Sequence, residues 1–464
     1  MNKNDLLKVR ITDLDQEGIG IGHTDTGMAM FVKDTVPGDL IMARVVKVKK
    51  SLAFGRVEQV IEPSPERIKP ACPKARACGG CVLQQMAYPA QLAVKQRKVE
   101  EALRRIGGVA HPELLMEPIT GMEIPWEFRN KMQFPFGQVD GHTVLGFYAG
   151  RTHALVPLDD CAVGHPVNRE VMRIVCRWAD QYGISTYDET THQGLLRHLL
   201  TRVGFATGEL MVCLVINGRK VPYADKLWGM LERIVESYGV QMVSLMYNVN
   251  TDHTNRILGA HSFTLHGQPF ITDTIGTLSF RISPGSFYQV NPVQTQRIYE
   301  KAMEYANLNG DETVWDMYCG TGTISLFLSQ KAHKVYGVEI VPEAIRDARQ
   351  NAADNGIKNV EFFVGKAEEV VPEWFRTQGA NTRIDVVVVD PPRKGCDAML
   401  LDTLVRMQPE RIVYVSCNPA TLARDVKILE SQGYLVEKAA PFDAFCHTMH
   451  CESVVKLVQA GSRP

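Results

Sequence analysis

Apolar and polar residues alternate in short runs over the first 68 residues of the chain. These runs are LLKVRITDLD, MAMFVKD, DLIMARVVKVKK and LAFGRVEQVIE, and turn-forming stretches such as EGIGIG and VPGD separate them. Alternation is typical of a strand with one buried face, and several short strands at close spacing are typical of a small closed barrel. We therefore predict a small β-barrel at residues 1–68, which ends in the proline-rich linker EPSPERIKP.

The final part of the chain, residues 271–464, alternates strand-like and helical patterns regularly. The strand-like runs are TVWDM, KVYGVEI, IDVVVVD and RIVYVSC, and helical runs such as PEAIRDARQNAADNG and ATLARDVKILESQG follow them. This alternation predicts an α/β, Rossmann-like domain in which helices cover both faces of a parallel sheet. Residues 69–270 mix the helical stretch QLAVKQRKVEEALRRIG with strand-like runs such as LMVCLVIN, and we expect an α+β domain there.

Length and composition agree with a multidomain globular protein. A chain of 464 residues exceeds what one hydrophobic core supports, and its 45% apolar and 22% charged residues are ordinary values. No apolar run is long enough to span a bilayer, and the start MNKNDLLKVR lacks the apolar core of a secretory signal. We therefore expect a cytoplasmic, monomeric enzyme with no membrane partner. A net charge of −1 gives no overall attraction to nucleic acid, so an RNA partner would need a local basic face.

A glycine-rich turn marks a candidate cofactor pocket. The run WDMYCGTGTISLFL predicts a strand, a tight turn with Gly320 and Gly322, and the start of a helix. Glu339 ends the next predicted strand, where a carboxylate can accept both hydroxyl hydrogens of a ribose. The turn lacks a third glycine and a following Walker lysine, which disfavours NAD and ATP and favours S-adenosylmethionine. The alternative is an ordinary tight connection between a strand and a helix.

A second polar motif follows the buried strand VVVV. Its end delivers Asp390 to the edge of the sheet where such folds bind ligands, and Pro391 and Pro392 stiffen the exit from the strand. A rigid loop suits a site that holds a planar base. A proline-rich cap on the strand is the alternative, but it leaves the charged residue at the strand end unexplained.

Cys417 is the candidate nucleophile. It ends the strand RIVYVSC at the same edge of the sheet, and a helix with Thr421 near its cap follows, which is expected to lower the pKa of a thiol. Carbon 5 of uracil is a poor nucleophile, but addition of a thiolate to carbon 6 produces an enolate whose carbon 5 can attack a methyl donor. Most cysteines are buried and inert, so the position of this one carries the prediction.

That chemistry also requires a general base, because the extra proton on carbon 5 must leave before the thiol is eliminated. His450 and Glu452, in HTMHCES near the C-terminus, are the candidates. Glu452 precedes the apolar run VVKLV, and burial beside it would raise the pKa of the carboxyl toward neutrality. A solvated acid at a strand edge is the alternative.

The motifs DMYCGTGT, DPPRKG, SCNPATLARD and HTMHCE occur in this order, and together they resemble the motif set of the bacterial RNA uracil-5 (5-methyluridine) methyltransferase family. SPGSFYQVNP matches the phenylalanine-x-glutamine motif of that family. The resemblance covers the last third of the chain. It implies that Cys417 is the covalent nucleophile and Glu452 the proton acceptor. It also implies that four residues contact S-adenosylmethionine: Gln289, Tyr318, Glu339 and Asp390.

A cysteine cluster, CPKARACGGC, lies at residues 72–81. Cys72, Cys78 and Cys81 have the spacing of metal ligands, and Cys161 in PLDDCAVGHP is a plausible fourth. Four thiolates suit either zinc or an iron–sulfur cluster, and the spacing does not decide between them. The resemblance does: the ribosomal-RNA branch of the family carries a [4Fe-4S] cluster at matching positions and begins with a TRAM barrel, whereas the tRNA branch lacks both. It therefore implies 23S ribosomal RNA as the substrate.

Two basic segments could contact that RNA. The strand that carries Arg44 and the run PWEFRNKMQFPF, with Arg129 and Lys131 between aromatic residues, suit contacts to phosphates and stacking on bases. The further basic residues of the first segment are Lys47, Lys49 and Lys50. Each segment could equally be a solvated strand with one basic face.

Three other functions compete with this interpretation. A methyltransferase acting on nitrogen does not need the cysteine at the next strand end. Cytosine-5 RNA methylation usually uses a second cysteine in the Asp390 loop, and DPPR has none. An RNA-binding module with a degenerate methyltransferase fold would not retain Gln289, Glu339, Cys417 and Glu452 together.

Overall fold

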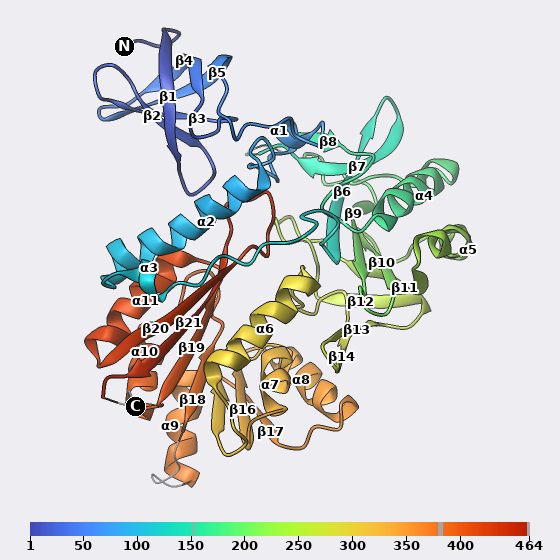
Figure 1. Cartoon of the computed structure of the whole chain (residues 1–464). Helices are drawn as coiled ribbons and strands as arrows, with labels where there is room; N and C mark the ends of the chain where they lie inside the picture. The colour runs from blue at the N-terminus through green and yellow to red at the C-terminus, as the bar shows by residue number, and fades with distance from the viewer. Residues whose placement is uncertain (151, 153, 379–383, 462–464) are drawn as a thin grey trace. The chain divides into compact units, whose positions relative to one another are not determined.

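The computed structural model describes residues 1–150, 152, 154–378 and 384–461, and the described chain divides into two compact units. The first unit consists of residues Met1–Lys95, Tyr148–Val156 and Phe445–His450. The second consists of Gln96–Phe147, Pro157–Ala444 and Cys451–Pro464. Figure 1 shows the elements of both units. No helix among the described residues is long and apolar enough to cross a membrane.

The N-terminal part of the first unit is a closed five-stranded barrel with the strand order β1-β2-β3-β5-β4 (Figure 1). Its strands are β1 Leu6–Leu14, β2 Gly20–His23, β3 Ala29–Val32, β4 Leu40–Val48 and β5 Leu52–Glu62. Alternate residues point inward, so that Val9 and Ile11 of β1 pack with Ile41 and Ala43 of β4 in one fully buried core. The prediction of a small N-terminal β-barrel is confirmed.

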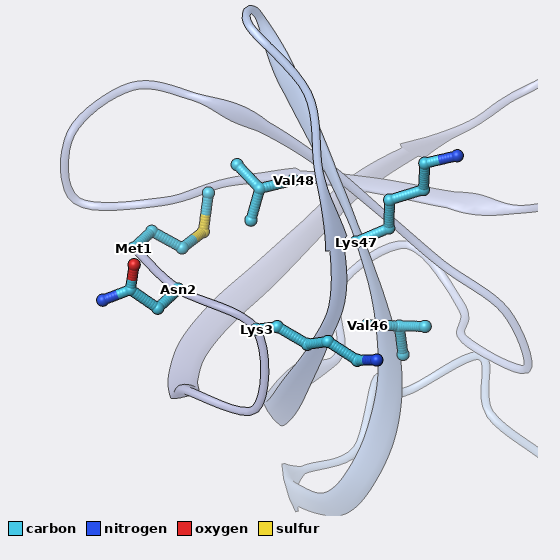
Figure 2. Close-up of a pocket in the computed structure, with 6 residues that line it drawn as sticks. All are labelled: Met1, Asn2, Lys3, Val46, Lys47 and Val48. Atoms are coloured by element: carbon cyan, nitrogen blue, oxygen red, sulfur yellow. The ribbon is translucent and has the colours of Figure 1, made fainter.

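The predicted basic strand of this barrel is partly neutralised. Arg44 on β4 pairs with Glu58 on β5 at 2.9 Å, whereas Lys47 is exposed. Figure 2 shows Lys47 on a shallow hollow where the N-terminal segment passes β4; Met1, Asn2, Lys3, Val46 and Val48 are its other lining residues. None of the predicted catalytic, cofactor or metal residues lines this hollow.

The rest of the first unit gathers segments that are distant in the sequence. It contains α1 Ala75–Cys78 and the start of α2 Tyr88–Ala102. Lys95 on α2 is buried, and its ammonium donates to the carbonyl of Phe445 at 2.9 Å. Gln91 donates to the carbonyl of Met86 at 2.7 Å and lies 3.3 Å from Nδ1 of His447. Residues Phe445–His450 are therefore held by α2, although they lie far from α2 in the sequence, just before the last strand of the chain.

The second unit contains most of a seven-stranded sheet with the order β12-β11-β10-β9-β6-β7-β8. Its strands are β6 Lys131–Val139, β7 His142–Tyr148, β8 Leu155–Pro157, β9 Leu196–Val203, β10 Glu209–Ile216, β11 Gln241–Val249 and β12 His261–Gly267. Two amphipathic helices, α4 Val167–Gln181 and α5 Ala224–Val235, contribute to its core. The central part of the chain is thus α+β, as the sequence predicts.

A second seven-stranded sheet carries the candidate site, with the order β17-β16-β15-β18-β19-β21-β20. Its strands are β15 Thr313–Asp316, β16 Lys334–Glu339, β17 Val360–Val364, β18 Val386–Val389, β19 Arg411–Ser416, β20 Tyr434–Phe442 and β21 Glu452–Gln459. All neighbours pair in parallel except β21, which is antiparallel to both β19 and β20. The Rossmann-like α/β fold is confirmed.

Helices cover both faces of this sheet (Figure 1). They are α6 Pro292–Ala306, α7 Thr323–Ser329, α8 Pro342–Asp354, α9 Ala367–Gln378, α10 Ala398–Met407 and α11 Pro419–Ser431. Trp315 and Tyr414 pack into the core beneath α9, α10 and α11. Asp316, the next residue after Trp315, points to the opposite face, where it accepts a hydrogen bond from Ser325 of α7.

Short elements complete the second unit. They are the π-helical turn η1 Leu103–Gly107, α3 Pro112–Leu115, the 3-10 turn η2 Glu236–Tyr238 and the hairpin β13 Ile271–Ile275 with β14 Leu278–Ile282. The hairpin lies beside the end of α8: Asn355, the residue after this helix, accepts a hydrogen bond from the backbone of Ser279 at 2.8 Å. The predicted division into parts 1–68, 69–270 and 271–464 is not tested by these contacts and stays a prediction.

Candidate active site

Four parallel strands of the C-terminal sheet end at one edge with a polar or nucleophilic residue. Asp316 ends β15, Glu339 ends β16, Asp390 follows β18 and Cys417 follows β19. The chain order reverses across β15, because β16 lies on one side of it and β18 on the other. Such a reversal opens a crevice at the carboxyl ends of the strands, which is where α/β sheets bind ligands.

The glycine-rich turn after β15 has the shape of a ligand cradle. Gly320 has a φ of 53°, and a Cβ added there would meet no atom within 4 Å. A Cβ on Gly322, whose φ is 81°, would lie 2.9 Å from the ring of Phe362. The first glycine therefore leaves open space for a ligand, and the second permits close packing of the turn on β17.

Asp316 lies in the same crevice and was missed at the level of sequence. Its side chain is fully buried, one oxygen accepts from Ser325 at 2.6 Å, and the other has no hydrogen-bond partner. Burial raises the pKa of this carboxyl to about 6. An orphaned buried acceptor beside an open glycine turn suits a ligand that carries a positive charge or donors. An acid at the end of the strand before a glycine-rich turn was the signal that could have identified it.

The predicted cofactor residues fit a ligand such as S-adenosylmethionine in this crevice. Glu339 is half-buried, and its Oε1 accepts from the backbone of Val341 at 2.9 Å, which leaves the other oxygen for a ligand. Tyr318 is also half-buried, and burial raises the pKa of its hydroxyl, so the hydroxyl stays neutral. Gln289 is half-buried in the loop whose Phe287 carbonyl accepts from Thr321 at 3.4 Å. That hydrogen bond joins the Gln289 loop to the glycine turn.

Asp390 and Glu452 form an acidic pair on the other side of the crevice. Burial raises the pKa of Asp390 to about 7, and the charge of Asp316 adds to the rise. Burial also raises the pKa of Glu452 to about 8, the charge of Asp390 adds to it, and the charge of Arg393 opposes it. The charge of Asp316 therefore acts on Asp390, and the charge of Asp390 acts on Glu452. The rise at Glu452 has the direction that the sequence predicts.

Cys417 lies beside this pair, and its electrostatics correct one expectation. Burial raises the pKa of the thiol to about 11, the carboxylates of Glu452 and Asp390 raise it further, and Arg393 lowers it. The lowered pKa expected from the following helix was wrong, because burial and two nearby acids raise it. Asn418 caps α11 by accepting from the backbone of Ala420 at 3.1 Å, and Thr421 lies in the first turn of this helix, near the cap.

Helix α11 holds the DPPRKG loop through its first two turns. The Asn418 amide and the Thr421 hydroxyl donate to the carbonyl of Arg393 at 3.0 and 3.3 Å. The Arg424 guanidinium donates to the carbonyls of Lys394 and Cys396, each at 3.1 Å. Two motifs separated in the sequence thus form one rigid unit, and Arg393 is kept beside the thiol and the acids.

Asp425 anchors the end of the same loop. It is fully buried and accepts from the backbone of Cys396 at 2.8 Å and from the hydroxyl of Tyr414 at 2.7 Å. A Cβ on Gly395, whose φ is 79°, would lie 2.6 Å from the Arg424 guanidinium and 2.7 Å from the Asp425 carboxylate. Only glycine therefore fits this turn without displacing the charged pair.

The other candidate base, His450, belongs to the first unit and is exposed. Its ring lies edge-on to that of Phe445, with the ring centroids 5.9 Å apart. Glu452 is 6% exposed. Of the two candidates, Glu452 alone has the buried setting that raises a carboxyl pKa.

The four predicted metal ligands fall into both units. In the first unit, Cys72 precedes α1, Cys78 is the last residue of α1 and Cys81 follows it, whereas Cys161 packs at the edge of the core of the central sheet in the second unit. Thiolates suit a soft metal or an iron–sulfur cluster. Across the described residues, however, no three His, Cys, Asp or Glu side chains are arranged to hold a metal ion.

Two family models match the chain. The model described as tRNA (Uracil-5-)-methyltransferase matches residues 270–460, which include all the predicted catalytic and cofactor residues. The model described as TRAM domain matches residues 3–57, which form the barrel up to the middle of β5.

Full-length relatives agree with these matches. An uncharacterized RNA methyltransferase of Halalkalibacterium halodurans is 49% identical over 98% of both chains. Another from Clostridium tetani is 43% identical over 100% of this chain and 98% of its own. The crystal structure of Pyrococcus abyssi tRNA (uracil-54, C5)-methyltransferase with S-adenosyl-L-homocysteine superposes with a TM-score of 0.77 at 28% identity, covering 97% of this chain and 100% of its own.

Proposed function

The chain belongs to the RNA uracil-5-methyltransferase family, and we propose that it methylates carbon 5 of a specific uridine in 23S ribosomal RNA, with Cys417 as covalent nucleophile and Glu452 as proton acceptor. One observation carries this proposal. Ser416 at the end of β19 is the direct partner of Ser453 in β21, so that the adjoining Cys417 and Glu452 lie at the same end of the two strands. A nucleophile and a base at one strand end are what attack on carbon 6 and proton removal from carbon 5 require.

The methyl donor would occupy the crevice between β15 and β18. S-adenosylmethionine supplies an electrophilic methyl group on a sulfonium. Glu339 would accept hydrogen bonds from the ribose, and Tyr318, Gln289 and Asp390 would hold the remainder of the molecule. The orphaned oxygen of Asp316 and the open space beside Gly320 support this assignment.

The residues of the chain would act in a fixed order. Cys417 would lose its proton to solvent, which the positive charge of Arg393 favours, and its sulfur would form a bond to carbon 6 of the uracil. Carbon 5 would then take the methyl group, with breakage of the methyl–sulfur bond of the donor, which would leave as a neutral thioether. Glu452 removes the proton from carbon 5, and the bond between sulfur and carbon 6 breaks as the double bond returns. A target uridine must leave its stack to reach these groups.

Tritium release tests this chemistry. RNA labelled with tritium at carbon 5 of uridine is incubated with the protein and S-adenosylmethionine, and the tritium that enters water is measured. Release that depends on S-adenosylmethionine supports the proposal. If no uridine-containing ribosomal or transfer RNA releases tritium, the proposed reaction is wrong. RNA labelled at carbon 5 of cytidine is the matched control, because release from it alone would indicate cytosine-5 methylation.

The choice of RNA has a second candidate. The solved tRNA enzyme aligns over 97% of this chain, so the aligned part includes residues of the barrel. A barrel-containing relative can therefore act on transfer RNA, which weakens the barrel as an argument for ribosomal RNA. Mapping 5-methyluridine in both RNAs from cells with and without the protein separates the two substrates.

We also propose that Cys72, Cys78, Cys81 and Cys161 bind a [4Fe-4S] cluster. Only the chemistry of the donors supports this cluster: thiolates are its usual ligands, and the chain offers three cysteines in or next to one short helix and a fourth in PLDDC. The methyl transfer needs no electron, so the cluster would have a structural or RNA-positioning role. We also propose the division into a barrel at 1–68, a cluster-bearing domain at 69–270 and a transferase domain at 271–464. We expect a monomer in the cytoplasm.

A further inference from the structure

Two cations face each other in the central sheet of the second unit. Lys131, the first residue of β6, is the direct cross-strand partner of Arg202 on β9. Like charges in directly opposed positions destabilise an antiparallel pair, whereas opposite charges stabilise it. A third cation, Arg129, lies nearby, and its Nε donates to the carbonyl of Lys131 at 3.5 Å. Packing alone gives no reason to place these charges together.

The opposed pair has no counter-ion within the described chain. Arg202 is 2% exposed; one of its terminal nitrogens donates to the carbonyls of Pro284 and Ser286, but its Nε is buried without a partner. Lys131 is half-buried, and no carboxylate of the described residues lies within 4.0 Å of its ammonium. A buried charge without an opposite charge is costly, so an anion supplied from outside would stabilise this site.

The electrostatics of the pair agree with an unmet demand for negative charge. Burial lowers the pKa of Lys131 to about 8, and the charges of Arg202 and Arg129 lower it further. Burial lowers the pKa of Arg202 to about 10. An anion bound beside the two side chains would oppose both shifts.

The pair is directly connected to the predicted crevice. Asn130 is the neighbour of Lys131. Its backbone N–H donates to the carbonyl of Val290 at 2.9 Å, and its side-chain amide donates to the carbonyl of Gln289 at 2.9 Å. Arg202 holds the same loop through Ser286. The cations therefore lie next to the loop that carries Gln289, where RNA bearing the target uridine would have to pass.

We propose that Lys131, in the field of Arg202 and Arg129, binds a backbone phosphodiester of the substrate RNA next to the target uridine. The inference rests on the proposed RNA substrate. Lysine binds phosphate as a point charge, and Lys131 is only half-buried. A purely structural role accounts for Arg202, which supports the Ser286 loop, but it gives no reason for a lysine opposite that arginine.

Variants of Lys131 test the site. Lys131→Met keeps the apolar stem and removes the charge, whereas Lys131→Arg keeps the charge; Lys226→Met changes an exposed lysine of α5 and is the matched control. We expect Lys131→Met to raise the KM for RNA several-fold with little change in kcat or in the KM for S-adenosylmethionine. It should also reduce the salt slope of RNA binding by about one unit. Lys131→Arg should restore both values, and Lys226→Met should change neither.

Two outcomes would overturn the proposal. A rise in the KM for S-adenosylmethionine alone would mean that the anion is the carboxylate of the methyl donor. Unchanged KM values and an unchanged salt slope in folded Lys131→Met would mean that the pair is structural.

A second measurement uses the unaltered protein and does not depend on methyl transfer. The protein is acetylated briefly with and without an unmodified 23S ribosomal RNA transcript, a transfer RNA transcript or S-adenosylmethionine, and modification of Lys131 is mapped by mass spectrometry. Either RNA, but not S-adenosylmethionine, should protect Lys131. Equal acetylation with every RNA would refute the site. Protection without tritium release would retain the site and reject the proposed reaction.

Discussion

Ser416 of β19 and Ser453 of β21 are directly opposed partners in an antiparallel pair. The residue after the first serine is Cys417, and the residue before the second is Glu452, so that both lie at one end of the two strands. The same end carries Asp390, whose charge raises the pKa of both the thiol and the carboxyl. This register turns two residues 35 positions apart in the sequence into one candidate catalytic pair.

Cys417→Ala should abolish tritium release from uridine-labelled RNA, because no other group would add to carbon 6. The fold should be retained, since Cys417 is only half-buried. Cys176→Ala, which changes a half-buried cysteine of α4, should keep normal activity and serves as the control. Turnover by folded Cys417→Ala would reject the nucleophile.

Glu452→Gln should accumulate a covalent adduct between protein and RNA. The amide cannot accept the carbon-5 proton, so elimination of Cys417 stops after methyl transfer. The adduct is measured as a shifted band in denaturing gels with labelled RNA, and Cys417→Ala in the same background should abolish it. A Glu452→Gln enzyme that turns over at the normal rate would show that another group is the base.

The logarithm of kcat/KM should rise with pH. Glu452, with a pKa of about 8, and Cys417, with a pKa of about 11, must both lose protons to act, and their raised pKa values keep both protonated near neutrality. Below pH 8 the slope should therefore be about two, and above it about one. Arg393→Met should move the profile to higher pH, because the guanidinium lowers both pKa values; Lys394→Met, which changes the adjacent exposed side chain, should leave it unchanged. A flat profile from pH 6 to 9 would contradict these roles.

Gly395→Ala should destabilise the protein by about 1–3 kcal/mol and lower kcat. The substitution forces a strained φ and displaces Arg424 or Asp425, which hold the loop of Arg393. Gly433→Ala is the matched control, since Gly433 also has a positive φ, 93°, but its added Cβ would meet no atom within 4 Å. Thermal melting and kcat are measured for both. Equal effects in the two variants would mean that backbone strain alone, and not the loop clamp, matters.

Protein purified without air should be brown and contain about four irons per chain. Cys81→Ser should lose the iron, whereas Cys176→Ser should retain it, because Cys176 lies on α4 outside the proposed ligand set. Metal content and the absorption spectrum are measured. Stoichiometric zinc without iron would reject the iron–sulfur assignment.

Most of the fold could be predicted from local sequence patterns. The alternation of LLKVRITDLD and MAMFVKD is sufficient for a barrel, because a strand with one buried face must repeat every two residues. The sequence VVVV before Asp390 is sufficient for a buried parallel strand. The order of the motifs was sufficient for the family.

Which distant segments of the chain lie next to each other could be learned only from the tertiary structure. The sequence by itself determined which residues carry chemistry, because that depends on residue type and local spacing. It did not determine that β21 inserts antiparallel between β19 and β20, which brings Glu452 to Cys417, because strand pairing is not local. For the same reason the direction predicted for the pKa of Cys417 was wrong, since the charge of Glu452, which raises this pKa together with burial, comes from that pairing.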